Sequence, residues 1–222
     1  MSTQVSELLG SARFAAHAAA QEAELAEIAD GLRAPESADR LRAARRLSAL
    51  ARAELSWMML PVRAHFLSAG TRGELAEALR TDEVALRDAL LIAIRNAYER
   101  YVTHPMWRQD PVAATVSDAD AAAWRAWMHP IAEGLIAASA PTTRVEAAYL
   151  LALCEDPRAW DVYLEVVAKR SGLLGHLELA ILRCPDSRTP EVRNALLDLA
   201  ARIAERHPRQ AYTAESVRSA LA

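Results

Sequence analysis

Residues 143–169 have the sequence TRVEAAYLLALCEDPRAWDVYLEVVAK, and this stretch decides the fold. Apolar residues recur about every three to four positions on both sides of Glu155-Asp156-Pro157, which is the spacing of an amphipathic helix. Proline cannot continue a helix because it lacks an amide hydrogen, and aspartate caps the start of the next one. The stretch therefore predicts a helix over 144–154, a tight turn, and a second helix that ends near Lys169.

The same helix start and stop signals recur along the whole chain: Ser, Thr or Asp comes before a run with helical apolar spacing, and Pro or Gly comes after it. Gly31 is expected to close the first helix, and Pro130 is expected to break or kink the helix that Ser117 begins, near His129. About eleven helices are predicted. Those with both ends predicted span about 3–30, 37–59, 81 or 82 to 101, 144–154, 173–184 and 190–206. Four more are predicted to begin near residues 61, 71, 117 and 213, and one, after the turn at 155–157, is predicted to end near residue 169. The fold class is therefore all-α.

Three threonines are expected to cap helices. Thr71 with Glu74, and Thr143 with Glu146, have the capping-box spacing, in which the hydroxyl and the carboxylate satisfy each other's backbone amides. Thr189 precedes a proline, which is favoured in the first turn of a helix. Each threonine therefore predicts where a helix begins.

Small and apolar residues recur in a fixed pattern within the deciding stretch. The pattern is Arg144-x-x-Ala147-Ala148-x-x-Leu151, then Asp156-Pro157-Arg158-Ala159, then Val162 and Leu164, with a partial echo at Arg40-x-x-Ala43-Ala44-x-x-Leu47. Paired small residues let two helices approach closely. The pattern resembles one bacterial HEAT-like repeat. The resemblance implies an α-solenoid whose concave face binds another protein, and it implies no chemistry by itself. An irregular multi-helix bundle is the alternative architecture.

The length of 222 residues suits a single all-α domain over 1–222. Its expected parts are an N-terminal helical half at about 1–103, an aperiodic connector at 104–116 and a repeat-like half at 117–222. A connector of that length inside a helical protein is uncommon and is often functional.

The charge balance does not point to a nucleic-acid partner, because 29 acidic and 26 basic residues leave a net charge of −3. The first ten residues lack the basic and apolar regions of a secretory signal, and no apolar run is long enough to span a membrane. A cytoplasmic protein without a membrane partner is therefore expected. Cys154 and Cys184 lie in separate predicted helices without CxxC spacing, so both are expected to be reduced.

The segment 98–130 is the strongest candidate for a binding site, because it contains three of the five tryptophans around the aperiodic connector. Trp, Tyr and Arg are favoured in interface hot spots. The alternative is that these aromatic side chains fill the space between helices and satisfy their polar tips on the backbone. The candidate binding residues are Tyr98, Tyr101, His104, Trp107, Arg108, Trp124, Trp127 and His129.

The other polar residues offer no chemical motif. The six histidines lack metal-ligand spacing, and no nucleophile elbow, phosphate loop or dinucleotide fingerprint occurs. No catalytic residue, metal or cofactor is therefore predicted. An arginine stripe on the second helix could hold phosphates or an acidic partner, or it could pair with the glutamates of the first helix. The stripe consists of Arg42, Arg45, Arg46 and Arg52.

These features favour a non-catalytic protein-binding module, such as a bacterial adaptor or an immunity or antitoxin protein that neutralises a partner. One alternative is an enzyme similar to the HEAT-like alkylpurine DNA glycosylases, although their basic concave face does not suit the negative net charge. That alternative would use Trp107, Asp110, Trp124, Arg144, Arg158 and Trp160. A small-molecule pocket at Trp107, Trp124 and Trp127 is another alternative. The oligomeric state is not predicted.

Overall fold

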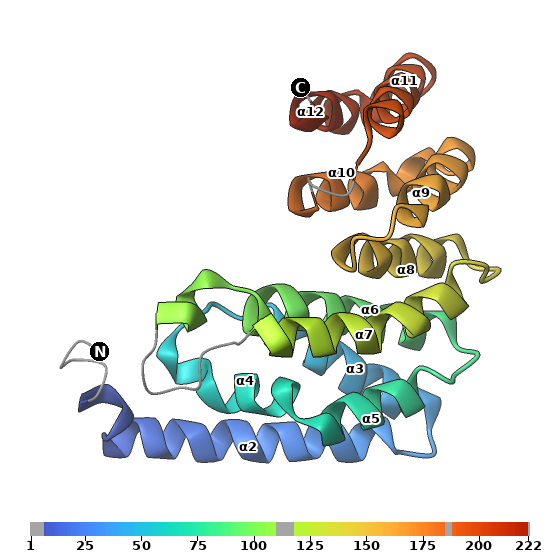
Figure 1. The fold of residues 1–222 in the computed structure, drawn as a ribbon. Helices are drawn as coiled ribbons and strands as arrows, with labels where there is room; N and C mark the ends of the chain where they lie inside the picture. Colours follow the sequence, from blue (N-terminus) through green and yellow to red (C-terminus); the bar gives the residue numbers. More distant parts are fainter. Residues whose placement is uncertain (1–6, 110–117, 185–187, 222) are drawn as a thin grey trace. The chain divides into compact units, whose positions relative to one another are not determined.

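The computed structural model describes residues 7–109, 118–184 and 188–221 (Figure 1). No strand occurs among these residues, and the all-α prediction is confirmed. By its internal contacts the chain divides into two compact units, Met1–Trp124 and Arg125–Ala222, with the boundary inside helix α7 (Asp118–Leu135). This boundary follows the predicted connector at 104–116, and the expectation of one domain stays a prediction. Within the described ranges, no helix is long and apolar enough to cross a membrane.

Unit 1 is built from α2 to α6, and its central helix is α3, which packs against both α2 and α6. Helix α6 continues directly into a π-helical turn, η2, and short 3₁₀ helices precede α4 and follow η2. The elements are α2 (Ala12–Leu32), α3 (Ser37–Ala51), η1 (Trp57–Met59), α4 (Leu60–Leu67), α5 (Ala69–Ala78), α6 (Val84–Ala97), η2 (Tyr98–Val102) and η3 (Pro105–Gln109).

The close packing of α2 on α3 depends on Gly31. This glycine lies inside α2, so the prediction that it closes the helix is wrong. A Cβ atom at Gly31 would lie only 2.8 Å from Cβ of Ala43, and the absence of a side chain therefore lets the two helices approach. The hairpin also pairs Arg46 with Glu24 at 3.4 Å and Glu27 at 3.1 Å, as the paired interpretation of the arginine stripe expected.

The second helix ends earlier than predicted, at Ala51 instead of about residue 59. Carbonyl groups at and just after its end accept hydrogen bonds from side chains of η2. The Tyr101 hydroxyl donates to the Leu50 carbonyl at 3.0 Å, and the Arg100 guanidinium donates to the Ala53 carbonyl. A tertiary contact thus ends a helix that the local pattern alone would extend.

Both predicted capping boxes are wrong. Helix α5 begins after Ser68, whose hydroxyl accepts from the Gly70 amide at 3.2 Å, whereas Thr71 lies inside the helix with its hydroxyl 3.4 Å from Nδ1 of His65. In unit 2, α8 begins at Pro141, so Thr143 is also internal and fully buried. In each case another start signal lies a few residues before the threonine and begins the helix earlier: the Ser68 hydroxyl for α5 and Pro141 for α8.

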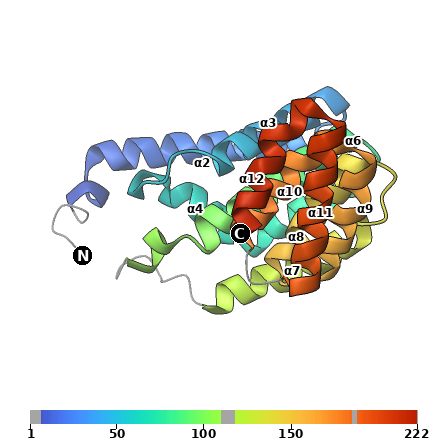
Figure 2. The same ribbon diagram turned by 90° about the horizontal axis from the view of Figure 1, so that it is seen from above.

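Among the described residues, unit 2 contains the second part of α7, the short 3₁₀ helices η4 (Ser171–Leu173) and η6 (Pro208–Gln210), and five further α-helices, which form two layers. Helices α8, α10 and α12 make one layer, and α9 and α11 make the other. Figure 2 shows α12 over α10, as their contacts require. Thr189 caps α11 as predicted, accepting from the Val192 amide at 3.4 Å. The helices are α8 (Pro141–Leu153), α9 (Arg158–Lys169), α10 (Leu174–Arg183), α11 (Pro190–Arg206) and α12 (Ala211–Leu221).

The predicted turn at 155–157 is present between α8 and α9. Glu155 has a left-handed backbone, with φ of 62°, and its amide bonds to the Ala152 carbonyl at 3.0 Å. The Asp156 amide bonds to the Leu151 carbonyl at 3.0 Å, which completes a Schellman motif. The Asp156 carboxylate accepts from the Arg158 amide at 2.9 Å, so it caps α9 as the sequence predicted.

Helix α7 continues through Pro130, so the helix does not break there, and the alternative prediction of a kink stays a prediction. Helices tolerate an internal proline when packing compensates for the missing amide hydrogen. The predicted start of this helix at Ser117 lies outside the described residues. Of the predicted connector, residues 105–109 form η3, and residues 110–116 also lie outside the described ranges.

Candidate functional site

Four of the eight predicted binding residues lie together in the core of unit 1. Tyr101, Trp107 and Trp124 are fully buried, and Tyr98 is 3% exposed. The Tyr101 ring stacks on Phe66 with centroids 5.5 Å apart and lies 6.2 Å from the Trp107 ring. Tyr98 lies 6.3 Å from Trp124. The faces of these rings are therefore occupied by other side chains of the unit.

Two polar tips of this cluster, the Tyr101 hydroxyl and Trp107 Nε1, bond to backbone carbonyl groups. Trp107 Nε1 donates to the Arg100 carbonyl at 2.7 Å, and the guanidinium of buried Arg63 lies 5.1 Å from the centroid of the Trp107 ring. Burial raises the pKa of Tyr101 to about 12, because the hydroxyl is removed from water, and the charge of Arg100 opposes this effect only in part. This arrangement favours the packing interpretation of the aromatic segment, and a binding role for the set stays a prediction.

The other four predicted residues are not part of this cluster. Nδ1 of half-buried His104 accepts from the Met106 amide at 3.2 Å, beside η3. The side chain of Arg108 lies outside the described part of the structure. Trp127 and His129 belong to unit 2, where Trp127 is half-buried. The contiguous sequence segment therefore contributes to two different structural environments.

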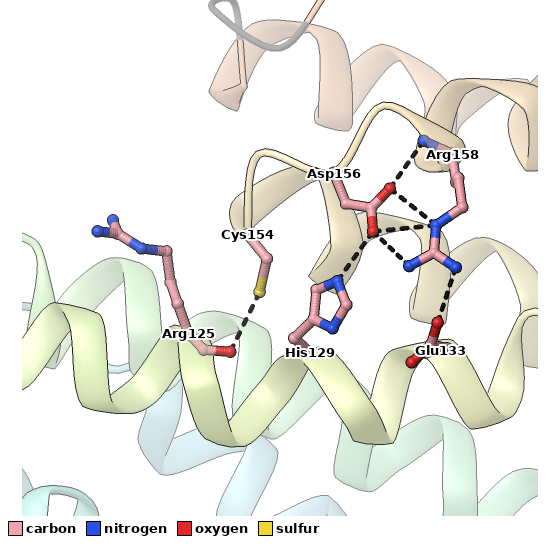
Figure 3. A network of polar contacts seen from close by, with 6 residues as sticks. All are labelled: Arg125, His129, Glu133, Cys154, Asp156 and Arg158. Atoms are coloured by element: carbon pink, nitrogen blue, oxygen red, sulfur yellow. Dashed lines mark hydrogen bonds and ion pairs between the residues drawn. The ribbon is translucent and has the colours of Figure 1, made fainter.

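His129 takes part in a network that ties α7 to the α8–α9 turn (Figure 3). Its Nε2 lies 2.8 Å from Oδ2 of Asp156, and the same carboxylate accepts from the Arg158 guanidinium at 2.6 Å. Arg158 also reaches back to Glu133 on α7, at 2.7 Å. Figure 3 shows Asp156 at the centre of these contacts, between the histidine and the arginine.

The Arg158 guanidinium holds the pKa of the Asp156 carboxyl well below its ordinary range. Asp156 is therefore an ionised acceptor, and His129 must donate to it through Nε2. A histidine oriented by a carboxylate is a familiar acid–base arrangement, and Cys154 lies two residues from the aspartate. However, burial raises the pKa of the Cys154 thiol to about 11, and its Sγ donates to the Arg125 carbonyl at 3.5 Å. A protonated thiol is a poor nucleophile, so the network acts as a structural clamp within unit 2.

Unit 1 also has an open hollow of about 500 Å³, which we call the arginine groove. It lies where the end of α2, the start of α3, the end of α5 and the start of α6 meet. Its apolar lining is Ala29, Leu32, Ala78 and Leu86, and its charged lining is Arg33, Arg40, Arg80, Glu74 and Glu77.

The three arginines of the groove differ in how firmly they are held. Arg40 is 28% exposed and donates to Glu83 at 2.6 Å and to two backbone carbonyls that precede α3. Arg33 is 58% exposed and pairs with Asp30 at 2.7 Å and Glu74 at 3.0 Å. Arg80 is 77% exposed and pairs with Glu77, three residues earlier in the chain, at 3.0 Å. The groove thus has one fixed guanidinium and two that solvent reaches easily.

Neither protein-family models, nor curated proteins, nor solved structures gave a match to this chain.

The tryptophans proposed for a glycosylase-like site are not exposed in their own units. Trp107, Trp124 and Trp160 are fully buried. Arg144 is engaged by Glu165 at 2.6 and 3.2 Å, and Asp110 lies outside the described residues. Over the described ranges, no group of three His, Cys, Asp or Glu side chains could hold a metal ion.

No single stretch of sequence predicts the arginine groove, because its lining comes from four helices that are distant along the chain. The local signal is weak. Arg33 and Arg40 flank the Ala34-Pro35 turn between two predicted helices, and Arg80 precedes Thr81 at another helix end. Arginines such as Arg33 and Arg80 are common at the C-terminal ends of helices, where a positive charge interacts favourably with the exposed carbonyl groups, so this pattern alone does not indicate a site.

Proposed function

We propose that this chain is a non-catalytic helical-repeat protein whose role is to bind another protein, as a bacterial adaptor or an immunity or antitoxin protein does. The observation that carries the proposal is the arginine groove. It combines an apolar floor with a polar, solvent-accessible rim, which is the anatomy of a protein–protein interface. The groove needs no rearrangement to receive a side chain from a partner.

The organisation of unit 2 supports the repeat part of the proposal. The HEAT-like pattern falls on α8 and α9, where Ala147, Ala148 and Leu151 are buried and Asp156 caps the second helix. The following helices continue the same two layers. A stack of this kind supplies a rigid scaffold and no reactive group of its own.

The polar network around Asp156 supports a non-catalytic role. Its aspartate and its arginine are committed to each other and to neighbours, and its thiol is protonated. Catalytic groups need a pKa near the working pH and access to a substrate. The groups of this network are instead arranged to hold a turn.

Filling the groove tests the proposal. Ala78→Trp places a large ring on the floor, whereas Ala23→Trp puts the same ring on an exposed position of α2 outside the groove. Affinity capture from cells of the source organism should recover a protein with the wild type and with Ala23→Trp, and lose it with Ala78→Trp. Equal recovery with both variants, or recovery of nothing by the wild type, would contradict the proposal.

A further inference from the structure

Basic side chains gather at one edge of unit 2. Consecutive helices from α9 to α12 are joined by short connections and run in alternating directions. Helices α9 and α11, which contact each other in one layer, are therefore parallel and end at the same edge (Figure 1). We call the exposed side chains at these two helix ends and at the following turn the basic edge. Its members are Lys169, Arg170, Arg202, Arg206, Arg209 and Tyr212.

The positive charge of the basic edge is not neutralised by neighbouring carboxylates. Lys169 pairs with Glu165 at 3.0 Å, but none of the four arginines has an ion-pair partner among the described residues. The segments 165–170 and 202–212 together contain five Lys and Arg residues and two carboxylates, Glu165 and Glu205, so their net charge is +3. The whole chain has a net charge of −3, which hides this local excess. A positive potential concentrated in this way attracts a polyanion.

The stability of the helices does not account for the whole set. Carbonyl groups at the C-terminal ends of α9 and α11 favour basic residues in the last turn, such as Lys169 and Arg206. Arg202 and Arg206, however, lie four residues apart on α11, and like charges at this spacing disfavour a helix. An anionic ligand that contacts both guanidinium groups removes this repulsion.

Tyr212 adds an aromatic surface beside these arginines. Its side chain is 88% exposed and lies at the start of α12, three residues after Arg209 in η6. A ring that remains in water contributes little to the core, because burial is the source of its stabilising effect. An exposed aromatic ring next to basic side chains is the combination on which the bases of a single-stranded nucleic acid stack.

We propose that unit 2 binds a single strand of DNA or RNA along the basic edge. The arginines contact phosphates, and Tyr212 stacks on a base. Packed helices lie about 8–10 Å apart, so the arginines at the ends of α9 and α11 reach different phosphates of one strand. An acidic protein segment would supply negative charge alone, whereas a nucleic-acid strand supplies both phosphates and bases. The inference concerns unit 2 and does not rest on the arginine groove of unit 1.

Fluorescence anisotropy with labelled oligodeoxythymidine and oligouridine of about 20 nucleotides tests the inference. The wild type should bind at least one of them at low salt, with an affinity that falls steeply as salt is added. Arg206→Glu with Arg209→Glu should weaken binding at least about tenfold and make the salt dependence less steep, because fewer phosphates are contacted. Tyr212→Ala should weaken binding at least about fivefold and leave the salt dependence nearly unchanged.

Arg183→Glu is the matched control for the charge reversals. Arg183 is an exposed arginine in the last turn of α10, at the opposite edge of unit 2, and the described residues provide it with no ion pair. Because salt screens charges at this separation, the control should change the affinity by less than about twofold. Circular dichroism establishes that each variant is folded. If the double reversal does not fold, Arg206→Gln with Arg209→Gln replaces it, and weaker binding is again expected.

Four results would overturn the inference. The wild type binds neither oligonucleotide at low salt, Arg183→Glu weakens binding as much as the double reversal does, or duplex DNA of the same length binds as tightly as the single strand. The fourth is displacement of the oligonucleotide by a polyglutamate peptide at an equal concentration of charge, which would show that the basic edge binds acidic protein segments instead.

Discussion

Nε2 of His129 on α7 lies 2.8 Å from Oδ2 of Asp156 in the α8–α9 turn. The aspartate side chain is only 10% exposed, and it also accepts from the backbone amide and the guanidinium of Arg158. The Asp156 carboxylate thus joins the α8–α9 turn to α7 and also caps α9. The HEAT-like pattern and the aromatic segment, which the sequence presented as separate features, meet at this bond.

Asp156→Ala should lower the free energy of unfolding of unit 2 by about 1–3 kcal/mol, because it removes charge-assisted hydrogen bonds and an N-cap together. Since the folded-state pKa of Asp156 is depressed, its contribution is present above the unfolded pKa and is lost as the pH falls through the folded value. Urea unfolding followed by circular dichroism measures the loss. Glu77→Ala, at an exposed ion pair, is the control and should change little.

Glu155→Gly should stabilise the protein. Glu155 is the only residue other than glycine with a positive φ among those described, and glycine adopts this conformation without a Cβ clash. The expected gain is about 0.5–1 kcal/mol after the greater chain entropy of glycine in the unfolded state is included. Thermal denaturation measures it. A lower melting temperature would mean that the weak 3.8 Å pair of Glu155 with Arg125 matters more than the backbone strain.

Gly31→Ala should destabilise unit 1 by about 1–3 kcal/mol, because the new Cβ would overlap that of Ala43 and force α2 and α3 apart. Gly73→Ala in α5 is the matched control. A Cβ atom there meets nothing within 4 Å, so the better helix propensity of alanine should raise stability by up to about 1 kcal/mol. Opposite signs for the two substitutions in urea unfolding are the expected result, and equal signs would contradict the close-packing role of Gly31.

Trp107→Ala should lower the free energy of unfolding by about 3–5 kcal/mol, because the ring is fully buried against Tyr101, Trp57 and the guanidinium of Arg63. Tyr212 is 88% exposed, so Tyr212→Ala should change stability by no more than about 0.5 kcal/mol. Thermal and urea unfolding of both variants measure the difference. Retained stability in Trp107→Ala would return this side chain to the list of candidate binding residues.

His65 should make the protein less stable in mild acid. Burial lowers the pKa of His65, and the nearby Glu74 only partly opposes this effect. Below its unfolded pKa of about 6.5, the unfolded chain binds the proton more readily, so stability falls as the pH decreases through that value. His65→Asn should remove this component. The measurement is the difference in unfolding free energy between wild type and variant as a function of pH. The contributions of the other histidines are common to both proteins and cancel in this difference.

Local chemistry in the sequence determined the helices and several of their ends. The turn at 155–157, the capping of α9 by Asp156 and the cap at Thr189 depend on residues within a few positions of each other, so the printed pattern contained the information. The pairing of Arg46 with Glu24 and Glu27 followed from the charge of two adjacent helices. Local competition also caused errors, as at Thr71, where Ser68 caps the helix instead.

Only the tertiary structure decided which side chains are buried and which are brought together. Tyr101 and Trp107 have the composition of a hot spot, yet Phe66 and Arg63 from another helix cover them. The arginine groove is likewise absent from any single segment, because its lining comes from four helices. Periodicity and capping act over a few residues, whereas burial and concavity depend on which distant faces pack together, and that is a property of the whole fold.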